Sequence, residues 1–348
     1  MKREDFVFSV AQLRTYLRLK NIPIAPGLLS EEHPFRLLIP TYYVDLINWQ
    51  DPNDALMKMV LTSNLEQDVR PYEVEDPIGD KPHSPVPGVI HRHKNRCLLM
   101  LTNVCAVHCR FCFRKNMLND NRADMHAAMD YIKATNSIEE VILSGGDPFT
   151  FPDAFMKSVV TKLGAVEHVR MIRFHTRTPV VYPARVTESF LEALVGPAPT
   201  TVVLHINHVR EITPEFIRSV YAMKKAGIML LSQTVLMKGV NDSVEALSAL
   251  MRGLVECGVK PYYLHHLDAA AGTHHFRISL SAGRALYAGL RASVSGIAVP
   301  LYVIDLPGGY GKYPVDMFVQ VKKGEYEVTL HDGRRHTYID YAEDAGLM

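Results

Sequence analysis

A repeated alternation of apolar, β-rich runs with segments of helical periodicity constrains the fold of this chain more than any other feature. The β-rich runs begin near residues 98, 141, 171, 201, 228 and 262. Segments with helical spacing lie between and after them, at residues 123–134, 153–163, 187–194, 214–226, 243–256 and 281–294. Because strands that alternate with helices form parallel sheets, we expect an α/β fold. Six such units predict an open, partial (β/α)6 barrel, and a doubly wound sheet is the alternative.

Two regions of different texture flank this repeat. Residues 1–90 contain short helical patches and end in a stretch, residues 76–88, that holds four prolines and two glycines and is typical of a linker. Residues 316–348 contain short β-like runs separated by Lys323-Gly324 and Asp332-Gly333, as in hairpins. We therefore expect a helical and extended N-terminal region at 1–90, the barrel at 91–315, and a small β-rich tail at 316–348.

The composition of the chain limits its partners and its location. Lys and Arg number 38 against 37 Asp and Glu, and a net charge of +1 creates no global field toward nucleic acid or an anionic membrane. No apolar run approaches the roughly 20 residues of a membrane helix, and the charged start, Met1 to Asp5, differs from a secretion signal. We expect a cytoplasmic protein with no nucleic-acid or membrane partner.

Polar side chains follow each apolar run of the predicted sheet. In α/β barrels the carboxyl ends of the strands build the active site. We therefore expect one barrel mouth that gathers a large set of ligand-binding side chains. They come from Asn103 with the cysteines, Ser144 to Asp147, His175 to Arg177, His205 to His208, Gln233, and His265 to Asp268.

The spacing of Cys105, Cys109 and Cys112 predicts a metal centre just after the first barrel strand. Thiolates suit zinc or iron–sulfur clusters, and an odd total of five cysteines does not suggest a disulfide framework. A structural zinc needs four ligands, and His108, the one further candidate, is crowded by its cysteine neighbours. Three thiolates leave one iron of a four-iron cluster open, so the motif favours a substrate-binding [4Fe-4S] cluster.

The loop at residues 305–314 is the second chemical signal. It places Lys312 after Gly308, Gly309 and Gly311, and glycines allow the backbone to approach a bulky group. A lysine can hold pyridoxal phosphate as a Schiff base. A glycine-rich loop with a lysine is also typical of a solvated turn, and the spacing is not that of a nucleotide-binding phosphate loop.

Together, the cysteine motif and the lysine loop resemble the lysine 2,3-aminomutase family of the radical S-adenosylmethionine superfamily. Phe111, before the last cysteine, belongs to the superfamily pattern, and Gly145 to Pro148 match its loop after the second strand. The matching stretches extend over the whole predicted barrel, at residues 91–96, 105–115, 143–148, 177–179, 205–208, 233–236, 240–242, 261–263, 268, 275–276 and 305–312.

The resemblance implies a radical reaction. The open iron of a cluster on Cys105, Cys109 and Cys112 would bind S-adenosylmethionine. One electron, from a donor such as flavodoxin or ferredoxin, would then cleave it to methionine and a 5′-deoxyadenosyl radical. Lysine would replace Lys312 on pyridoxal phosphate, and its amino group would migrate from Cα to Cβ. The resemblance thus implies an isomerase that interconverts L-lysine and β-lysine, and it leaves room for a homo-oligomer.

The resemblance also implies a role for each matching residue. Arg114 would hold the substrate carboxylate through the bidentate contact that a guanidinium favours, and Asp268 with Asp305 would hold the distal ammonium. Residues expected to hold pyridoxal phosphate are Lys312, as the Schiff base, with Arg92 and Arg96 at the phosphate. Residues expected to contact S-adenosylmethionine are Phe111, Gly145, Gly146, Asp147, His205 and Gln233.

Several alternatives stay open at the level of sequence. The chain could belong to the branch that makes β-lysine for modification of elongation factor P, or it could act on another amino acid. No cysteine follows Cys257, so the C-terminal zinc cluster of many free-lysine aminomutases has no thiolate ligands here. A radical enzyme without pyridoxal phosphate and a degenerate cluster-binding regulatory module are the other classes that the motifs allow.

Overall fold

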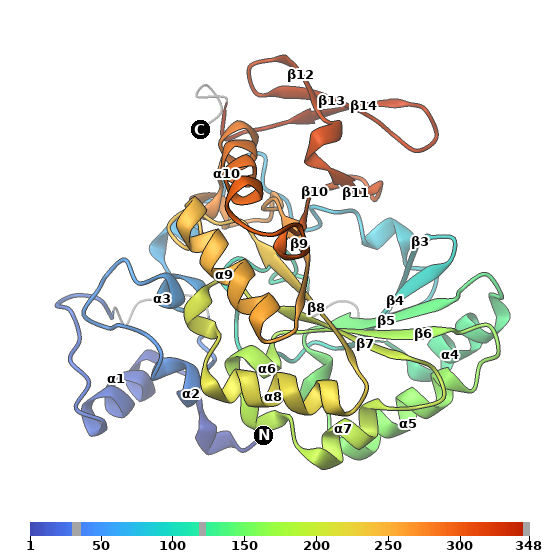
Figure 1. Cartoon of the computed structure of the whole chain (residues 1–348), viewed down its shortest axis with the longest axis horizontal. Helices are drawn as coiled ribbons and strands as arrows, with labels where there is room; N and C mark the ends of the chain where they lie inside the picture. Colours follow the sequence, from blue (N-terminus) through green and yellow to red (C-terminus); the bar gives the residue numbers. More distant parts are fainter. Residues whose placement is uncertain (30–35, 118–122, 344–348) are drawn as a thin grey trace.

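Parallel strands form the centre of one curved sheet in the computed structural model, which describes residues 1–29, 36–117 and 123–343 (Figure 1). Within these residues the sheet has nine strands, in the order β11-β10-β9-β8-β7-β6-β5-β4-β3. Strands β4 to β10 are parallel to their neighbours, whereas β3 and β11 pair antiparallel at the edges. The strands are β3 (Val89–His93), β4 (Arg96–Thr102), β5 (Glu140–Gly145), β6 (Met171–Thr176), β7 (Thr200–His205), β8 (Met229–Val235), β9 (Lys260–His265), β10 (Leu301–Leu306) and β11 (Gly311–Pro314).

The predicted partial barrel is confirmed by this strand order. The six predicted strands correspond to β4 through β9, and each strand lies beside the next one in the chain, unlike in a doubly wound sheet. Strand β10 adds a further parallel strand that the sequence rhythm did not mark as a barrel unit. Its register with β11 places Asp305 opposite Lys312.

Helices cover the outer face of the sheet (Figure 1). Most begin at a side chain that accepts a backbone N–H, such as Asp124 before α4, Ser243 before α9 and Ser279 before α10, because the first turn of a helix leaves its N–H groups without partners. The helices between the strands are α4 (Met125–Ala134), α5 (Asp153–Gly164), α6 (Thr178–Val181), α7 (Glu188–Leu194), α8 (Pro214–Lys225), α9 (Val244–Glu256) and α10 (Leu280–Ser293). None of the described helices has both the length and the apolar character that crossing a membrane requires.

The N-terminal region packs directly on the loop that carries the cysteines. The backbone N–H of His108 donates to Leu38 O at 3.0 Å, and that of Arg110 donates to Met59 O at 2.9 Å. The apolar core is continuous from this region into the barrel. The elements of the region are β1 (Phe6–Val7), α1 (Val10–Leu19), β2 (Ile39–Pro40), α2 (Thr41–Val44) and α3 (Ala55–Val60).

The C-terminal part is a small antiparallel sheet, as expected for a β-rich tail. It consists of β12 (Val319–Lys322), β13 (Glu325–Thr329) and β14 (Arg335–Ile339) and lies at the end of α10 (Figure 1). Asp340, after β14, accepts the backbone N–H of Leu280 at 2.5 Å and so joins the tail to α10. Residues 90 and 315 remain our proposed domain boundaries. The apolar core is continuous across both of them.

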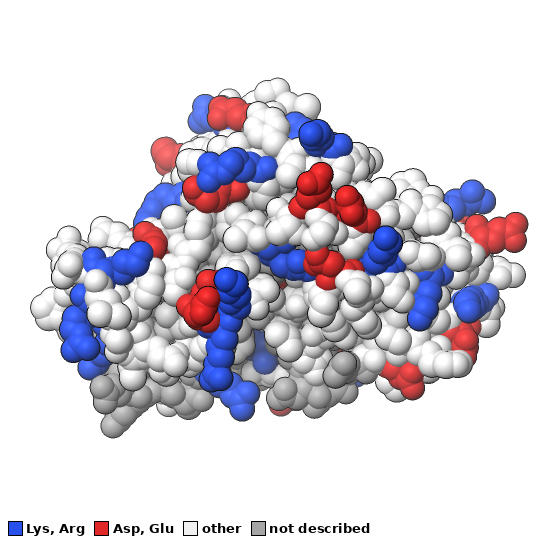
Figure 2. Space-filling view, turned by 90° about the horizontal axis from the view of Figure 1, so that it is seen from below, with Lys and Arg blue, Asp and Glu red and all other residues white. Residues whose placement is uncertain are grey.

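Acidic and basic side chains are interspersed on the face of the molecule shown in Figure 2. This distribution agrees with the near balance of 38 basic and 37 acidic residues in the chain. Of the charged groups at the barrel mouth, Asp80, Arg114 and Asp305 are instead buried, and Arg92, Asp268 and Lys312 are partly buried.

The ends of β4 and β5 approach each other so closely that the second residue of the Gly145-Gly146 pair must lack a side chain. Gly146 N donates to Thr102 O at 2.6 Å, and Asp147 N donates to Val104 O at 2.8 Å. A Cβ on Gly146 would lie 2.3 Å from Val104 O. Val104 directly precedes Cys105, so this contact sets where the cysteine loop begins.

Gly146→Ala should therefore destabilise the protein by about 1–3 kcal/mol, the usual cost of forcing extra volume against a neighbour that cannot move. The matched control is Gly296→Ala, because a Cβ there meets nothing within 4 Å. Thermal unfolding of both variants measures the difference. Equal melting temperatures for the two variants would show that the strand ends can separate without cost.

Candidate active site

A cavity opens at the carboxyl ends of the parallel strands. Its volume is about 200 Å³. Every residue assigned a role from the sequence lines this cavity except Arg96. Those that line it are Arg92, Cys105, Cys109, Phe111, Cys112, Arg114, Gly145, Gly146, Asp147, His205, Gln233, Asp268, Asp305 and Lys312.

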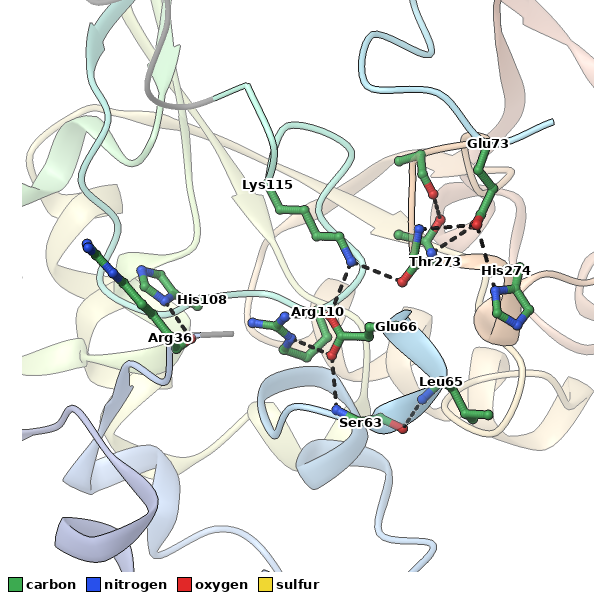
Figure 3. Close-up of polar contacts among 12 residues, drawn as sticks. Arg36, Ser63, Leu65, Glu66, Glu73, His108, Arg110, Lys115, Thr273 and His274 are labelled. Carbon is green, nitrogen blue, oxygen red and sulfur yellow. Dashed lines mark hydrogen bonds and ion pairs between the residues drawn. The ribbon is translucent and has the colours of Figure 1, made fainter. Parts of the chain in front are cut away.

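The three thiols of Cys105, Cys109 and Cys112 are free and border the cavity together. Among the described residues, no three or more His, Cys, Asp or Glu side chains are grouped to hold a metal ion. A four-iron cluster takes each thiolate at a separate iron and does not require the sulfurs to meet at one point. His108, the alternative zinc ligand, lies outside the cavity lining and turns its Nδ1 to Arg36 O at 3.1 Å (Figure 3).

The cysteine loop is fixed from behind by one buried carboxylate (Figure 3). Glu66 is 1% exposed and accepts two hydrogen bonds from the guanidinium of Arg110, one of them Nε to Oε1 at 2.9 Å. Lys115 Nζ donates to Glu66 Oε2 at 3.1 Å and to Gly272 O at 3.0 Å. Glu66 thus joins the cysteine loop, through Lys115, to the loop that follows β9.

A second carboxylate of the N-terminal region holds that same loop (Figure 3). Glu73 accepts the backbone N–H groups of Gly272 and Thr273 at 3.1 and 2.9 Å. Sequence reasoning missed both acids. The Ser63-x-x-Glu66 capping box could have marked Glu66 as a helix-start residue, but no local pattern connects either acid to the barrel mouth.

Oppositely charged groups alternate across the substrate side of the cavity. Lys312 Nζ donates to Asp305 Oδ2, and Arg92 Nη1 lies 3.8 Å from Asp305 Oδ1. Arg92 Nη2 is 3.5 Å from Asp80 Oδ1, and Arg114 donates to Asp80 Oδ2 through Nε at 3.1 Å and Nη2 at 2.5 Å. Each of these charges therefore has a partner of opposite sign, as burial requires.

Asp80 is a site residue that sequence reasoning missed. It is fully buried, although it belongs to the proline-rich stretch that the sequence presents as a linker. Its carboxylate accepts hydrogen bonds from the guanidinium of Arg114, the group expected to hold a substrate carboxylate. No motif surrounds Asp80, so only the fold shows that a linker residue reaches the cavity wall.

Asp268 and Asp305, the two acids expected to bind a distal ammonium, differ in their ionisation. Burial, and then the charge of Asp305, raises the pKa of Asp268 to about 7. Burial alone would raise the pKa of Asp305 as well, but Lys312 and Arg92 hold it below its ordinary value. Asp305 is therefore ionised at neutral pH, and a bound cation would favour the ionised form of Asp268.

Neutral histidines line the inner wall. Burial lowers the pKa of His175 and His205 well below the ordinary value, and burial together with Lys312 lowers that of His265 to about 3. The Nε2 atoms of His175 and His205 are buried without a hydrogen-bond partner. Because buried polar atoms in proteins are normally paired, these two nitrogens indicate a missing ligand. His175 was not assigned a role from the sequence.

The chain is similar to known proteins over most of its length. A model of the radical SAM superfamily matches residues 99–251. The L-lysine 2,3-aminomutase of Clostridium subterminale is 36% identical over 312 residues, which cover 88% of this chain and 75% of that protein. The L-lysine 2,3-aminomutase of Escherichia coli K12 is 36% identical over 90% of this chain and 95% of that protein, and that of Haemophilus influenzae is 38% identical over 79% and 82%.

This chain belongs to the lysine 2,3-aminomutase family. It is therefore an enzyme of the isomerase class, within a superfamily whose members use a [4Fe-4S] cluster, S-adenosylmethionine and a reductant. The family and the enzyme class predicted from the sequence are confirmed.

Two residues matched to the aminomutase pattern have their side chains engaged within the protein. Asp147 uses its carboxylate within the protein: it accepts Thr176 Oγ1 at 2.7 Å, Arg177 N at 2.8 Å, Thr178 N at 2.9 Å and Phe149 N at 3.0 Å. It thereby joins the ends of β5 and β6. Arg96 begins β4, does not line the cavity, and donates to Asn95 Oδ1 at 3.2 Å.

The glycines before Lys312 have a packing reason as well as a binding one. A Cβ on Gly309 would lie 2.3 Å from His83 Nε2, and a Cβ on Gly79 would lie 2.7 Å from Gly309 N. The loop between β10 and β11 therefore lies against the stretch before β3 and connects the two edges of the aminomutase barrel. Gly79 and Gly309 also have φ of 71° and 83°, which favours glycine.

Glu66→Gln tests the anchoring of the cysteine loop. We expect a loss of about 3–5 kcal/mol in the free energy of unfolding, because the change removes one partner of a buried ion pair. Glu327→Gln is the matched control, since Glu327 faces Arg335 at 3.3 Å on the surface, where ion pairs contribute little. Denaturant unfolding of both variants gives the two values. A loss of less than about 0.5 kcal/mol for Glu66→Gln would contradict the anchoring role.

Proposed function

We propose that this enzyme interconverts L-lysine and β-lysine by migration of the α-amino group, with a [4Fe-4S] cluster, S-adenosylmethionine and pyridoxal phosphate. The observation that supports this most is the content of one cavity. Three thiols, Lys312 and the acid pair Asp268 and Asp305 all border it. The relatives named above carry the same activity in their names.

The residues fit the two organic groups. S-adenosylmethionine, held at the open iron, would supply the hydrogen-abstracting radical, and pyridoxal phosphate would supply a π-system beside the migrating nitrogen. Phe111 and the unpartnered Nε2 of His205 lie with the cysteines on one wall. Lys312 and Arg92 lie with Asp305 on the other. For the cofactor phosphate we propose Arg92, because Arg96 does not line the cavity.

The acid pair explains a preference for lysine. In this structure Asp305 holds the ammonium of Lys312, at the end of a four-carbon chain like that of the substrate. When Lys312 is engaged with the cofactor it no longer presents an ammonium, and the carboxylate of Asp305, which stays ionised beside Arg92, is then free for another alkylammonium. Asp268 stands beside it with a pKa that burial has raised. We propose that the two acids exchange the ammonium of Lys312 for the distal ammonium of lysine.

Arg114 would bind the substrate carboxylate by a similar exchange. Its guanidinium already donates to a carboxylate, that of Asp80, through Nε and Nη2. A substrate carboxylate can use the remaining donor or displace Asp80. The apolar side chains of Leu98, Phe113 and Leu267 border the cavity and reduce the access of water to reactive species.

The alternative functions differ mainly in how the product is used and less in the residues of the site. The elongation factor P branch makes the same β-lysine, and another amino acid would need a cationic side chain to suit the acid pair. A degenerate module would be expected to lack a cluster cysteine or Lys312, and this chain has all four. A flavodoxin or ferredoxin as reductant, a cytoplasmic location and a homo-oligomer complete the proposal.

Anaerobic reconstitution tests the function directly. With iron, sulfide, pyridoxal phosphate, S-adenosylmethionine and dithionite, we expect the enzyme to convert L-lysine to β-lysine, seen by product analysis. Cys105→Ala should lose the cluster absorbance and the cleavage of S-adenosylmethionine. Lys312→Ala should keep the cluster but lose the visible absorbance of bound pyridoxal phosphate and the product. Stoichiometric zinc without iron, or borohydride trapping of the pyridoxal group on another lysine, would refute the respective roles.

The raised pKa of Asp268 predicts a pH dependence of substrate binding. Below its pKa of about 7 the carboxyl is protonated and cannot hold an ammonium. Between pH of about 6 and about 8 the ionised fraction rises from about a tenth to about nine-tenths, so the apparent KM for lysine should fall by up to about tenfold. The charged groups that act on Asp268 are Asp305, Lys312, Arg277 and Arg114.

Asp268→Asn should remove this dependence, because an amide does not titrate in that range. The distal amine of lysine stays charged throughout, with an ordinary pKa of about 10.4. Steady-state kinetics of the wild type and the variant across the range supply the comparison. The same slope in both proteins would assign the titration to another group.

A further inference from the structure

Arg177 contacts a thiol of the cysteine motif directly. It follows β6, is 5% exposed, and borders the cavity. Its Nη1 donates to the sulfur of Cys109 at 3.0 Å. Its other terminal nitrogen, Nη2, donates to Glu211 Oε1 at 2.8 Å and to the hydroxyl of Tyr43 at 3.2 Å. One guanidinium therefore connects the cysteine loop, the segment after β7 and the N-terminal region.

The position of Arg177 is fixed on its backbone side by Asp147. The backbone N–H groups of Arg177 and Thr178 donate to Asp147 Oδ2 at 2.8 and 2.9 Å. The engagement of Asp147 within the protein thus has a consequence at the cluster. By joining β5 to β6, Asp147 presents the Arg177 side chain to Cys109.

Glu211 fixes the far side of the guanidinium. It is fully buried, and its Oε2 accepts the backbone N–H groups of Asn207 and His208 at 2.7 and 3.1 Å. Its Oε1 accepts the hydroxyl of Tyr43 at 2.8 Å. Because Nη1 and Nη2 are both engaged, the Arg177 guanidinium cannot turn away from Cys109 without leaving Glu211 or the hydroxyl of Tyr43 without its contact.

Donors at the sulfurs of an iron–sulfur cluster influence its reduction potential. Reduction adds one negative charge to the cluster, and an N–H group aimed at a ligand sulfur stabilises the reduced form more than the oxidised form. A buried cation has the same effect over a longer range, and a buried anion has the opposite effect. Arg177 supplies both a donor and a charge, and Glu211 compensates the charge alone.

We propose that Arg177, acting through the sulfur of Cys109, raises the reduction potential of the cluster, and that Glu211 limits this rise. The inference rests on the proposed ligation by Cys105, Cys109 and Cys112. One electron enters from a low-potential one-electron donor, and Arg177 keeps its proton throughout. Asp147 and Tyr43 position the pair and do not contact the cluster cysteines.

The reduction potential itself is the test, measured by titration with the electron paramagnetic resonance signal of the reduced cluster in the absence of S-adenosylmethionine. Arg177→Met should be harder to reduce, with a reduced-to-oxidised ratio on the order of tenfold lower at a fixed potential, which is ~59 mV for one electron. Glu211→Gln should be easier to reduce, because the arginine charge is then uncompensated. The double variant should still be harder to reduce than the wild type, because it lacks the donor to sulfur.

Arg185→Met is the matched control. Arg185 is also buried and follows β6, but it donates to Phe149 O at 2.8 Å and to Asp153 Oδ1 at 2.7 Å, outside the cavity lining. Its removal should lower stability and leave the potential unchanged. A shift of the same size in this variant would make the Arg177 effect a general consequence of instability and would overturn the proposal.

The outcomes separate this inference from the proposed function. A wild-type protein that assembles no cluster on the three cysteines contradicts the function. A normal cluster whose potential does not move in Arg177→Met, or returns to the wild-type value in the double variant, contradicts only the inference. If Arg177→Met does not retain iron, the reduction potential of Glu211→Gln is the test, and a value at or below that of the wild type overturns the proposal. The reduction potential of Arg177→Lys should then lie below that of the wild type, because a lysine lacks the second terminal nitrogen that lets Arg177 contact both Cys109 and Glu211.

Discussion

Charged side chains in the barrel mouth are largely shielded from water, so each needs a neighbour of opposite charge. These ion pairs connect the N-terminal region to the barrel. Asp80 lies between Arg92 and Arg114, and Glu211 accompanies Arg177. Because an unpaired buried charge costs several kcal/mol, each partner must be supplied by some segment of the chain. Asp80 comes from the N-terminal region, as does Glu66 behind the cysteine loop, and these pairs join that region to the barrel together with the shared core.

The same compensation prepares the site for its substrate. A lysine side chain and an aspartate, Lys312 and Asp305, already form the pair that a substrate ammonium would form with the protein. Arg114 and Asp80 likewise form the pair that a substrate carboxylate would form. Under the proposed function, a substrate ammonium would take the place of the Lys312 ammonium, and a substrate carboxylate would take the place of Asp80 at Arg114. The proposed preference for a substrate with charges at both ends would follow, since a neutral side chain would not pair with these acids.

The loop that carries Cys105, Cys109 and Cys112 is held in position by contacts on several sides. Glu66 fixes the loop from behind, Gly146 fixes its start, and Arg177 contacts Cys109 from within the cavity. Asp147 links two of these contacts, because it accepts both the Arg177 and Thr178 N–H groups while its own N–H donates to Val104 O. A loop that carries three thiols is thus held by short-range hydrogen bonds, and the thiols border the cavity.

The sequence by itself determined the features that are local in the chain: the alternation of strands and helices, the spacing of the cysteines, and Lys312 in its glycine loop. Each is a short-range pattern and can be read without the fold. The tertiary structure alone decided which charges meet. Asp80 and Arg114 are 34 residues apart, and Arg177 and Tyr43 are 134 apart, and no periodicity marks such pairs. For the same reason only the fold shows that Arg96, which fits a motif, lies outside the cavity lining: its guanidinium donates to the neighbouring Asn95.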